Sequence, residues 1–345
     1  MPRIRIFLCT YRRPHLLRRA LASLLAQTFT DWVCELHNDD PADDAPRAIL
    51  AELAPGDSRF NYFAHSKNWG AVATFNHVYA GGPEPYASLL EDDNWWAPDF
   101  LSTALRTIEE HPAASLVWAN MRLWQEQPDG SWLDTGHTIW TTRPASPRIR
   151  IFPEPELYQA FDALHSQGAM VFRPRHFNSS PIPSALPVAI IESARERAAT
   201  GPLILITTPL AHFARTLTTA RSQDPALWLQ SKLLVAASFF QTVTVSPAAL
   251  ARLWVQCRAQ RPRNTDTLFR LGITLGPPRL LRYARPGDWI HFILSSVRHP
   301  VRFVRVLRFR RSHPETWAWF VAQSGAHTRA KTAQASLFTK EVAAA

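Results

Sequence analysis

Short apolar runs alternate with longer amphipathic segments over the first ~120 residues, and few folds accommodate that order. The runs are rich in branched and aromatic residues, as buried strands are, and they lie at 3–11, 32–38, 60–65, 85–90 and 114–124. Segments with helical spacing, most of them bounded by proline or glycine, lie at 12–29, 46–53, 71–81 and 98–112. Connections this short predict an α/β domain with a mainly parallel, Rossmann-like sheet flanked by helices.

The pattern changes after this alternating region. Residues 126–165 are rich in proline, glycine, threonine and tryptophan and predict loops. Later elements are expected as a strand at 166–174, a helix at 192–201 and a strand at 202–216. Beyond about residue 222 the pattern becomes helical, with arginines on one face. We predict a first domain over 1–220, with halves at 1–125 and 126–220, and a basic helical extension over 221–345.

The charge of the chain is concentrated in this extension. The formal charge is +10, yet residues 221–345 hold 19 lysines and arginines against 5 aspartates and glutamates. Residues 1–220 hold 19 against 23. Such asymmetry favours an anionic partner for the extension, and a layer of phospholipid headgroups fits. Nucleic acid fits the charge as well, but the sequence contains no recognised nucleic-acid-binding module, so we expect no nucleic acid.

Cysteine content and hydropathy point to an intracellular protein. Cys9, Cys34 and Cys257 are far apart and lack CxxC spacing, which argues against a disulfide framework or a zinc cluster. The N-terminus has no long apolar segment of the secretory type. No window reaches the ~18–20 uncharged apolar residues of a spanning helix. We expect a cytoplasmic chain, peripheral on the inner face of the cell membrane if the basic extension binds lipid.

Polar clusters follow four of the expected strands. They are "CTY" at 9–11, "NDD" at 38–40, "HSKN" at 65–68 and "EDDN" at 91–94. In open α/β sheets, ligands bind outside the carboxyl ends of the strands, so these clusters are expected to converge on one crevice. Neither GxGxxG nor GxxxxGK[ST] follows the first strand, which disfavours a dinucleotide fold or a P-loop.

Three successive acids, Glu91, Asp92 and Asp93, come directly after an apolar strand. Charges in that position need compensation. Mg²⁺ or Mn²⁺ prefers hard carboxylate oxygens together with substrate phosphates, so the cluster favours a metal-bound diphosphate. The alternative is that one acid caps the following helix, whose first-turn amides need acceptors.

Four segments taken together resemble family 2 glycosyltransferases of the GT-A fold. In order, they are "TYRRPHLLRRALASLLAQTFTDW", "NDDPADD", "KNWGAVATFNH" and "EDDNWWAPDFL", with "SQGAMVFR" and "PLAHFART" similar to later segments. The resemblance covers roughly residues 1–215. It implies a GT-A nucleotide-diphospho-sugar transferase fold and an inverting, metal-dependent transfer from a nucleotide-sugar, with a UDP-sugar favoured.

The resemblance also implies roles for individual residues. Thr10 and Tyr11 would flank the nucleotide base and ribose, and Asp39 would accept a hydrogen bond from the uracil N–H. Asn68 would lie near the nucleotide, and Asp92 near the ribose and metal. Asp93, with Glu91, would bind Mn²⁺ or Mg²⁺ as the DxD-like motif. An Asx-turn within "DDPADD" is the alternative for Asp39 and above all for Asp40.

The sequence departs from the family pattern in four respects. The residue before Asp39 is Asn38 rather than the usual aspartate, and "DDGS" is replaced by "DDPA". The arginine expected before Asn76 is Phe75, so one cation near the diphosphate is missing. The usual Glu-Asp pair of the catalytic base is absent, and Glu192 is the candidate base that remains. The alternative for Glu192 is a first-turn acid that complements the helix dipole.

Aromatic, histidine and arginine side chains leave further alternatives open. Trp95 and Trp96 could stack on a sugar ring or pack in the core. The histidines show neither HxH nor HxxxH spacing and are expected at the surface or packed. The segment 295–313 places four arginines along one helical side, namely Arg298, Arg302, Arg305 and Arg308. This pattern favours either a membrane surface or packing on the first domain.

These observations predict a glycosyltransferase of the hexosyltransferase type. Its partners would be a nucleotide-sugar donor and a glycan or lipid-linked acceptor in the synthesis of a bacterial surface polysaccharide. Two alternatives stay open at this point. One is a non-catalytic protein on a GT-A fold that binds glycan or membrane, and the other is a nucleotidyltransferase, whose glycine-rich, lysine-containing loop the chain lacks.

Overall fold

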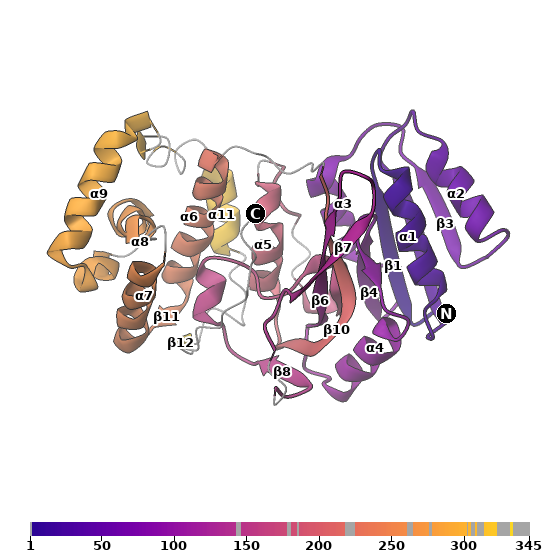
Figure 1. Ribbon diagram of the computed structural model, residues 1–345. Helices are drawn as coiled ribbons and strands as arrows, with labels where there is room; N and C mark the ends of the chain where they lie inside the picture. The colour runs from indigo at the N-terminus through magenta and orange to yellow at the C-terminus, as the bar shows by residue number, and fades with distance from the viewer. Residues whose placement is uncertain are drawn as a thin grey trace.

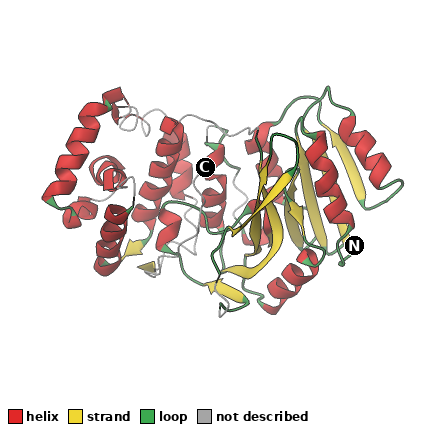
Figure 2. Cartoon of the chain, in the orientation of Figure 1, coloured by secondary structure: helices red, strands yellow, loops and turns green. Residues whose placement is uncertain are grey.

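A computed structural model describes most of the chain, in two regions that lie side by side (Figure 1). A sheet flanked by helices occupies one side, and helices from the second half of the chain occupy the other (Figure 2). The described residues are 2–142, 146–177, 181–184, 186–217, 225–260, 265–275, 278–301, 303–304, 308, 314–322 and 332–333.

Ten strands form the central sheet, and its main path has the order β3-β2-β1-β4-β9-β6-β10-β5. β7 extends the sheet from β6, and β8 from β10. Strands β3, β2, β1 and β4 are mutually parallel, as are β6 and β10, whereas β9 runs antiparallel between β4 and β6. The strands are β1 (Ile4–Thr10), β2 (Trp32–Asn38), β3 (Phe60–Ala64), β4 (Tyr86–Glu91), β5 (Trp95–Trp96), β6 (Leu116–Glu126), β7 (Trp132–Thr138), β8 (Ile149–Phe152), β9 (Met170–Phe172) and β10 (Leu203–Arg215), with a separate pair β11 (Thr244–Val245) and β12 (Thr332–Ala333).

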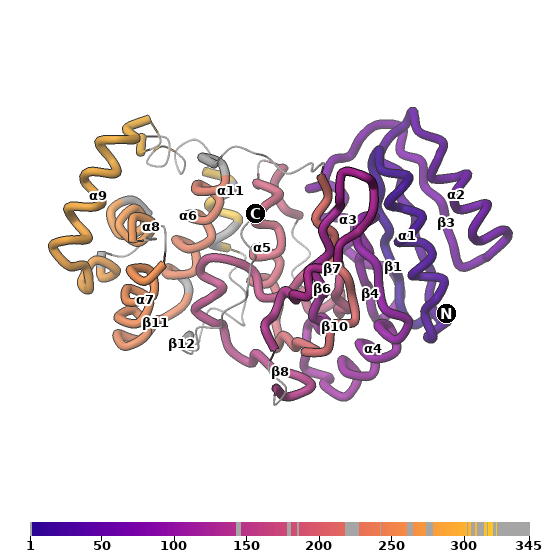
Figure 3. Tube along the Cα trace, viewed as in Figure 1, coloured from indigo at the N-terminus to yellow at the C-terminus, as the bar shows by residue number. Residues whose placement is uncertain are grey.

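Helices cover both faces of the sheet and then form the second region, as the chain trace shows (Figure 3). The α-helices are α1 (Pro14–Leu25), α2 (Ala45–Leu53), α3 (Gly70–Ala80), α4 (Phe100–Glu110), α5 (Ile191–Ala198), α6 (Pro225–Thr242), α7 (Pro247–Ala259), α8 (Thr265–Arg270), α9 (Pro286–Arg298) and α11 (Pro314–Ala322). Short 3₁₀ and π turns are η1 (Leu157–Ala160), η2 (Gln167–Ala169), η3 (Pro174–His176), η4 (Val188–Ile190), η5 (Leu271–Leu275) and η6 (Pro278–Tyr283).

Alternation along the strands assigns the two faces of the sheet. On β1, Ile4, Ile6 and Leu8 pack with apolar side chains of α1 and α4, while Phe7 packs on the opposite face with Val78 of α3. Side chains on a strand point alternately to opposite faces, so one apolar run supplies both cores.

The order of the strands reverses at β1. The chain runs from β1 outward to β2 and β3, and then returns to place β4 on the other side of β1. The register pairs Cys9 with Glu91, so the carboxyl ends of β1 and β4 lie level. This reversal is where open α/β sheets bind ligands.

The hydrophobic cluster of the second region crosses residue 220. Leu157 of η1, Ile191 of α5 and Phe239 of α6 belong to one buried cluster. Arg197 of α5 is buried and donates to the backbone oxygen of Val235 at 2.6 Å and to the hydroxyl of Ser238, both on α6. Burial lowers the pKa of Arg197 to about 9. The extension therefore packs on the first domain through α6, and the domain boundary at 220 stays a prediction.

The predicted fold class is confirmed, while the later elements differ in detail. The predicted strand at 166–174 is shorter, because residues 167–169 form η2 and only Met170–Phe172 pair as β9. The segment 126–165, predicted as loops, contains β7 and β8. Their side chains are mostly half-buried or exposed, so the sequence carries little of the apolar alternation typical of strands.

Candidate active site

The first feature of the site is a buried contact between the ends of β1 and β4. The hydroxyl of Thr10 donates a 2.8 Å hydrogen bond to Oδ2 of Asp92, whose side chain is fully buried. Burial raises the pKa of the Asp92 carboxyl to about 6. The structure thus brings Thr10 and Asp92, both predicted from the sequence to lie near the nucleotide, into direct contact.

Arg13, just before α1, compensates the acidic cluster. Its Nη1 lies 2.8 Å from Oδ2 of Asp93, and its Nη2 forms an ion pair with Asp92. Arg19, in the second turn of α1, donates from Nη2 to the backbone oxygen of Asp93 at 2.9 Å. The two arginines fasten α1 to the end of β4. Neither was assigned to the acidic cluster from the sequence, since a pairing between residues 13 and 92 has no local signature.

Glu91 and Asp93 differ from Asp92 in exposure. The Asp93 side chain is 21% exposed, so its carboxylate reaches the surface. Glu91 is half-buried and accepts a 2.8 Å hydrogen bond from Nδ2 of Asn94. Gly168 of η2 packs on this pair, because a Cβ there would lie 2.8 Å from Oε2 of Glu91 and 2.6 Å from Nδ2 of Asn94. Only glycine allows η2 to approach the acidic cluster this closely.

Glu192 lies next to the same loop. At the start of α5 its Oε1 accepts a 3.3 Å hydrogen bond from the backbone N–H of Gln167, the neighbour of Gly168. The fold therefore brings Glu192 to the loop that covers Glu91. Glu196, one turn on, is buried and accepts from the backbone and the ring of His165 and from Gln159. These bonds give Glu196 a structural role and leave Glu192 as the candidate base on this helix.

Asp39 lies at the N-terminus of α3. Its carboxylate accepts from the backbone N–H of Trp69 at 2.5 Å, from that of Gly70 at 3.0 Å and from Nδ1 of His65 at 3.0 Å. A carboxylate offers about four acceptor positions, so one remains after these three donors. Asp40 forms the Asx-turn, because its Oδ1 accepts from the backbone N–H of Ala42 at 3.1 Å. The turn alternative therefore describes Asp40 and not Asp39.

Tyr11 and Asn68 are exposed at the rim of the crevice. Between Tyr11 and Arg13, Arg12 adopts a φ of 57°, which is uncommon for a residue other than glycine. Its Nε donates to Oδ2 of Asp40 at 2.7 Å, and its guanidinium lies 4.8 Å from the centre of the Tyr11 ring. This left-handed turn ends β1 and presents Tyr11 to solvent.

The paired tryptophans pack rather than line an open surface. Trp96 is 2% exposed and donates from Nε1 to the backbone oxygen of Gly168 at 2.7 Å. Trp95 lies between the guanidinium of Arg19, 3.7 Å from the ring centre, and the ring of His212, stacked at 4.8 Å. The packing alternative predicted for these residues fits these contacts.

The donor set fits a hard divalent cation at Asp93. Mg²⁺ and Mn²⁺ are commonly held by one or two protein carboxylates together with substrate phosphates and waters. Asp93 offers an accessible carboxylate and Glu91 a half-buried one, whereas Asp92 is turned inward onto Thr10 and Arg13. Such an ion would share Asp93 with Arg13 or displace it.

A cavity of about 300 Å³ opens beside the N-terminus of α3. Trp69, Gly70 and Asn76 line one wall, and Ile182 and Val188 line the other. Asn76 holds the two walls together, because its side chain exchanges hydrogen bonds of 2.7 and 3.0 Å with the backbone of Ile182. Asp39 lies directly behind this helix terminus, so the cavity adjoins the predicted nucleotide crevice.

The fold is that of GT-A glycosyltransferases. The family model "Glycosyl transferase family 2" matches residues 5–176, about half of the chain, and the chain belongs to this family. Membership of this family favours sugar transfer over the nucleotidyltransferase and non-catalytic alternatives. A relative in Escherichia coli (strain K12), the colanic acid biosynthesis glycosyl transferase WcaA, is 28% identical over 119 residues. That match spans 34% of this chain and 42% of the relative.

Solved structures show the same fold. S. aureus TarS has 12% identity and a TM-score of 0.55, with 89% of this chain and 55% of that chain covered. For TarS 1–349 in complex with UDP, the TM-score is 0.56 at 12% identity, and for its complex with UDP-GlcNAc it is 0.55 at 13% identity. Both matches cover 90% of this chain and 92% of the other. At this level of identity the likeness concerns the fold.

Proposed function

We propose that the chain transfers a sugar from a UDP-sugar to a glycan or lipid-linked acceptor in the synthesis of a surface polysaccharide. The observation that carries the proposal is the meeting of Thr10, Asp92 and Asp93 at the reversal of strand order, level with the end of β1. Family membership supports the sugar transfer. The UDP complexes of TarS and the polysaccharide role of WcaA support the choice of donor and pathway.

In this proposal the nucleotide lies along the ends of β1, β2 and β4. Asp39 has one acceptor position left for the uracil N–H, and the exposed ring of Tyr11 offers a face to the base. Thr10 and Asp92 lie on the ribose side, and Asn68 borders the nucleotide from the loop before α3. Arg13 pairs with Asp92 and Asp93, and in this proposal it faces the diphosphate.

Asp93 and Glu91 are the residues that would hold Mn²⁺ or Mg²⁺. When bound, such an ion supplies Lewis-acid stabilisation of the charge that develops on the departing nucleoside diphosphate. Glu192 takes the proton of the acceptor hydroxyl as that oxygen attacks the anomeric carbon from the face opposite the leaving group. Displacement of this kind inverts the anomeric configuration. The glycine at 168 keeps Glu192 and Glu91 on either side of the same loop.

Calorimetric titration with UDP tests the proposal. Wild type is expected to bind UDP in the presence of Mn²⁺ and to bind it at least about tenfold more weakly in EDTA. In Asp93→Ala, UDP affinity is expected to be equally weak with Mn²⁺ and with EDTA, because the accessible carboxylate is removed. Asp99→Ala, an exposed acid that follows the same segment, serves as the matched control and should bind UDP like wild type. Absence of UDP binding with and without metal would reject the UDP-sugar donor.

The acceptor side of the proposal includes an anionic membrane surface. On α9, Ile290, Ile293, Leu294 and Val297 are between 55 and 73% exposed and recur at helical spacing. The extension to which α9 belongs holds 19 lysines and arginines against 5 aspartates and glutamates. Apolar side chains flanked by cations match an anionic lipid layer. Among the described residues, no helix is long and apolar enough to cross a bilayer. Arg302 and Arg305 of the predicted basic face lie outside the described residues.

Vesicle sedimentation checks the membrane surface. Vesicles that contain anionic phospholipid are expected to bind wild type more tightly than neutral vesicles. The double substitution Ile290→Ser and Leu294→Ser should weaken vesicle binding by about tenfold or more, because two large apolar side chains no longer insert into the lipid layer. Leu133→Ser, at an apolar side chain 56% exposed on β7, is the control and should not change binding. Equal binding of all three proteins would contradict the assignment of this face.

A further inference from the structure

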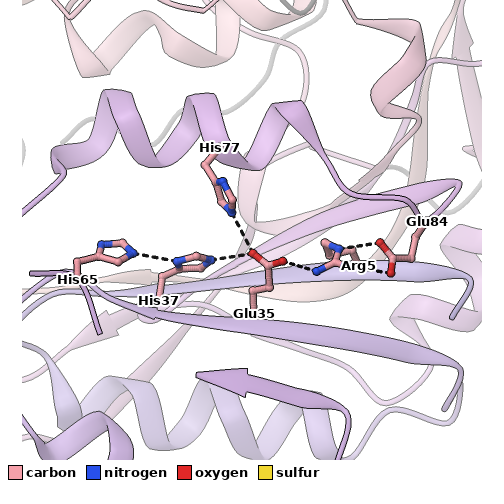
Figure 4. Close-up of polar contacts among 6 residues, drawn as sticks. All are labelled: Arg5, Glu35, His37, His65, His77 and Glu84. Carbon is pink, nitrogen blue, oxygen red and sulfur yellow. Dashed lines mark hydrogen bonds and ion pairs between the residues drawn. The ribbon is translucent and has the colours of Figure 1, made fainter. Parts of the chain in front are cut away.

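A second group of side chains that could bind a metal ion lies between β2 and α3 (Figure 4). Glu35 and His37 are two residues apart on β2, so they project from the same face of the sheet, and His77 comes from α3. Oε2 of Glu35 lies 3.0 Å from Nε2 of His37 and 2.9 Å from Nε2 of His77. One ligand atom of each residue lies within 4.8 Å of the other two. Within the described residues this is the one such group of three or more.

With both imidazoles neutral, the surrounding hydrogen bonds lack one donor. Nδ1 of His37 lies 2.9 Å from Nε2 of His65, and Nδ1 of His65 lies 3.0 Å from Oδ1 of Asp39. Between the carboxylates of Asp39 and Glu35, three contacts thus pass through two imidazoles. Two neutral imidazoles carry only two N–H groups, so one of the three contacts has no proton. A cation on Nε2 of His37 removes the shortage.

We propose that Glu35, His37 and His77 form a binding site for a transition-metal ion of the zinc class. Two imidazoles and one carboxylate make a ligand set that leaves a fourth position open. With the ion on Nε2, Nδ1–H of His37 donates to His65, whose own Nδ1–H donates to Asp39. Ligating histidines are usually oriented through their second nitrogen in this way. Zinc bonds of about 2.0 Å need the ligand atoms roughly 3.3 Å apart. The two contacts of Glu35, at 3.0 and 2.9 Å, need to lengthen by only a few tenths of an ångström, and the ligand nitrogens of His37 and His77 lie within 4.8 Å of each other.

The neighbouring charges leave room for the ion. Arg5 pairs with Oε1 of Glu35, whereas both histidines face Oε2. Arg5 also makes hydrogen bonds of 2.6 and 2.8 Å to Glu84, which offsets its charge (Figure 4). His37 is buried and stacks on Phe63, whereas the side chain of His77 is 39% exposed and provides a route of entry.

This site differs in chemistry from the acidic cluster at the end of β4. Imidazole nitrogen favours zinc, copper, nickel or iron, whereas carboxylates and phosphates favour Mg²⁺ and Mn²⁺. The inference does not rest on the proposed function. Its structural consequence is a fastening of α3 to β2 beneath the loop that carries Asn68, with Asp39 connected to the ion through two histidines.

Zinc titration of the metal-stripped full chain tests the site. Wild type and Asp93→Ala are both expected to bind one equivalent of Zn²⁺ with high affinity. His77→Ala should weaken this binding by about 100-fold or more, because it removes a ligand. His65→Phe keeps all three ligands but removes the bond that orients His37, and should weaken zinc binding by about 10- to 100-fold. His137→Ala, at an exposed histidine on β7, is the matched control. Equal zinc affinity of His77→Ala and His137→Ala would overturn the proposal.

The absorption of the Co²⁺-loaded chain provides a second measurement. Cobalt in a four-coordinate nitrogen and oxygen site absorbs visible light far more strongly than six-coordinate cobalt. The strong band is expected for wild type, Asp93→Ala and His137→Ala, and should be lost in His77→Ala while circular dichroism shows an unchanged fold. A weak six-coordinate spectrum in wild type would refute the ligand set. Since neither measurement uses UDP or sugar transfer, the site can fail while the proposed function holds.

Discussion

Replacement of Glu192 by glutamine is expected to lower kcat by about 10²- to 10⁴-fold, the usual contribution of a general base. Glutamine retains the oxygen that accepts from Gln167 but cannot take a proton from the acceptor hydroxyl. UDP affinity should stay within about twofold of wild type, because the proposed nucleotide contacts come from β1, β2 and β4. The rate of UDP release from the best UDP-sugar donor, with UDP affinity measured by calorimetry, checks both parts.

Two further variants make this result specific. Glu110→Gln, at an exposed acid on α4, should leave kcat unchanged. Glu192→Asp, which keeps an ionisable carboxyl on a shorter side chain, should recover part of the lost rate. If the rate of Glu192→Gln falls by the same factor as its UDP affinity, Glu192 acts in donor binding and not as a base. A rate equal to wild type would remove it from the reaction.

Local sequence pattern predicts the first half of the fold because that half is built from adjacent strand–helix units. Each apolar run on β1, β2 or β4 is buried on both faces and is followed by a helix with a proline or glycine at a boundary. β7 and β8 lack that signal, since each pairs at the side of the sheet and buries little. Their place depends on β6 and β10, which a local pattern does not contain.

In the candidate site, too, some residues are predicted from the sequence and others depend on the tertiary fold. The resemblance and the strand ends predicted Thr10 and Asp92, and they are in contact. The link from Arg13 to Asp92 joins residues 79 apart in sequence, and only the topology brings them together. The proposed zinc ligands likewise combine a local signal with a contact that only the fold creates. Glu35-x-His37 is a local signal for two ligands on one strand face, but the third, His77, arrives from α3.

Arg13→Met is expected to destabilise the metal-free protein by about 3 kcal/mol at pH 8, because it leaves the buried charge of Asp92 without its cation. The double variant Arg13→Met, Asp92→Asn should be more stable than Arg13→Met alone, since a neutral amide needs no cation. Arg18→Met, which breaks an exposed pair with Glu52 on the same helix, should not change the free energy of unfolding. Urea denaturation in EDTA measures all four proteins.

The pH dependence separates this charge effect from lost packing. Burial raises the pKa of Asp92 to about 6, above its ordinary value near 4, so protonation stabilises the folded state. The contribution of Asp92 to wild-type stability is therefore fully present below pH 4 and is lost as the pH rises to about 6. Without Arg13 the pKa of Asp92 rises further, and the decline continues above pH 6. The stability difference between wild type and Arg13→Met should open above pH 6, and a difference independent of pH from 5 to 8 would show that Arg13 acts through packing.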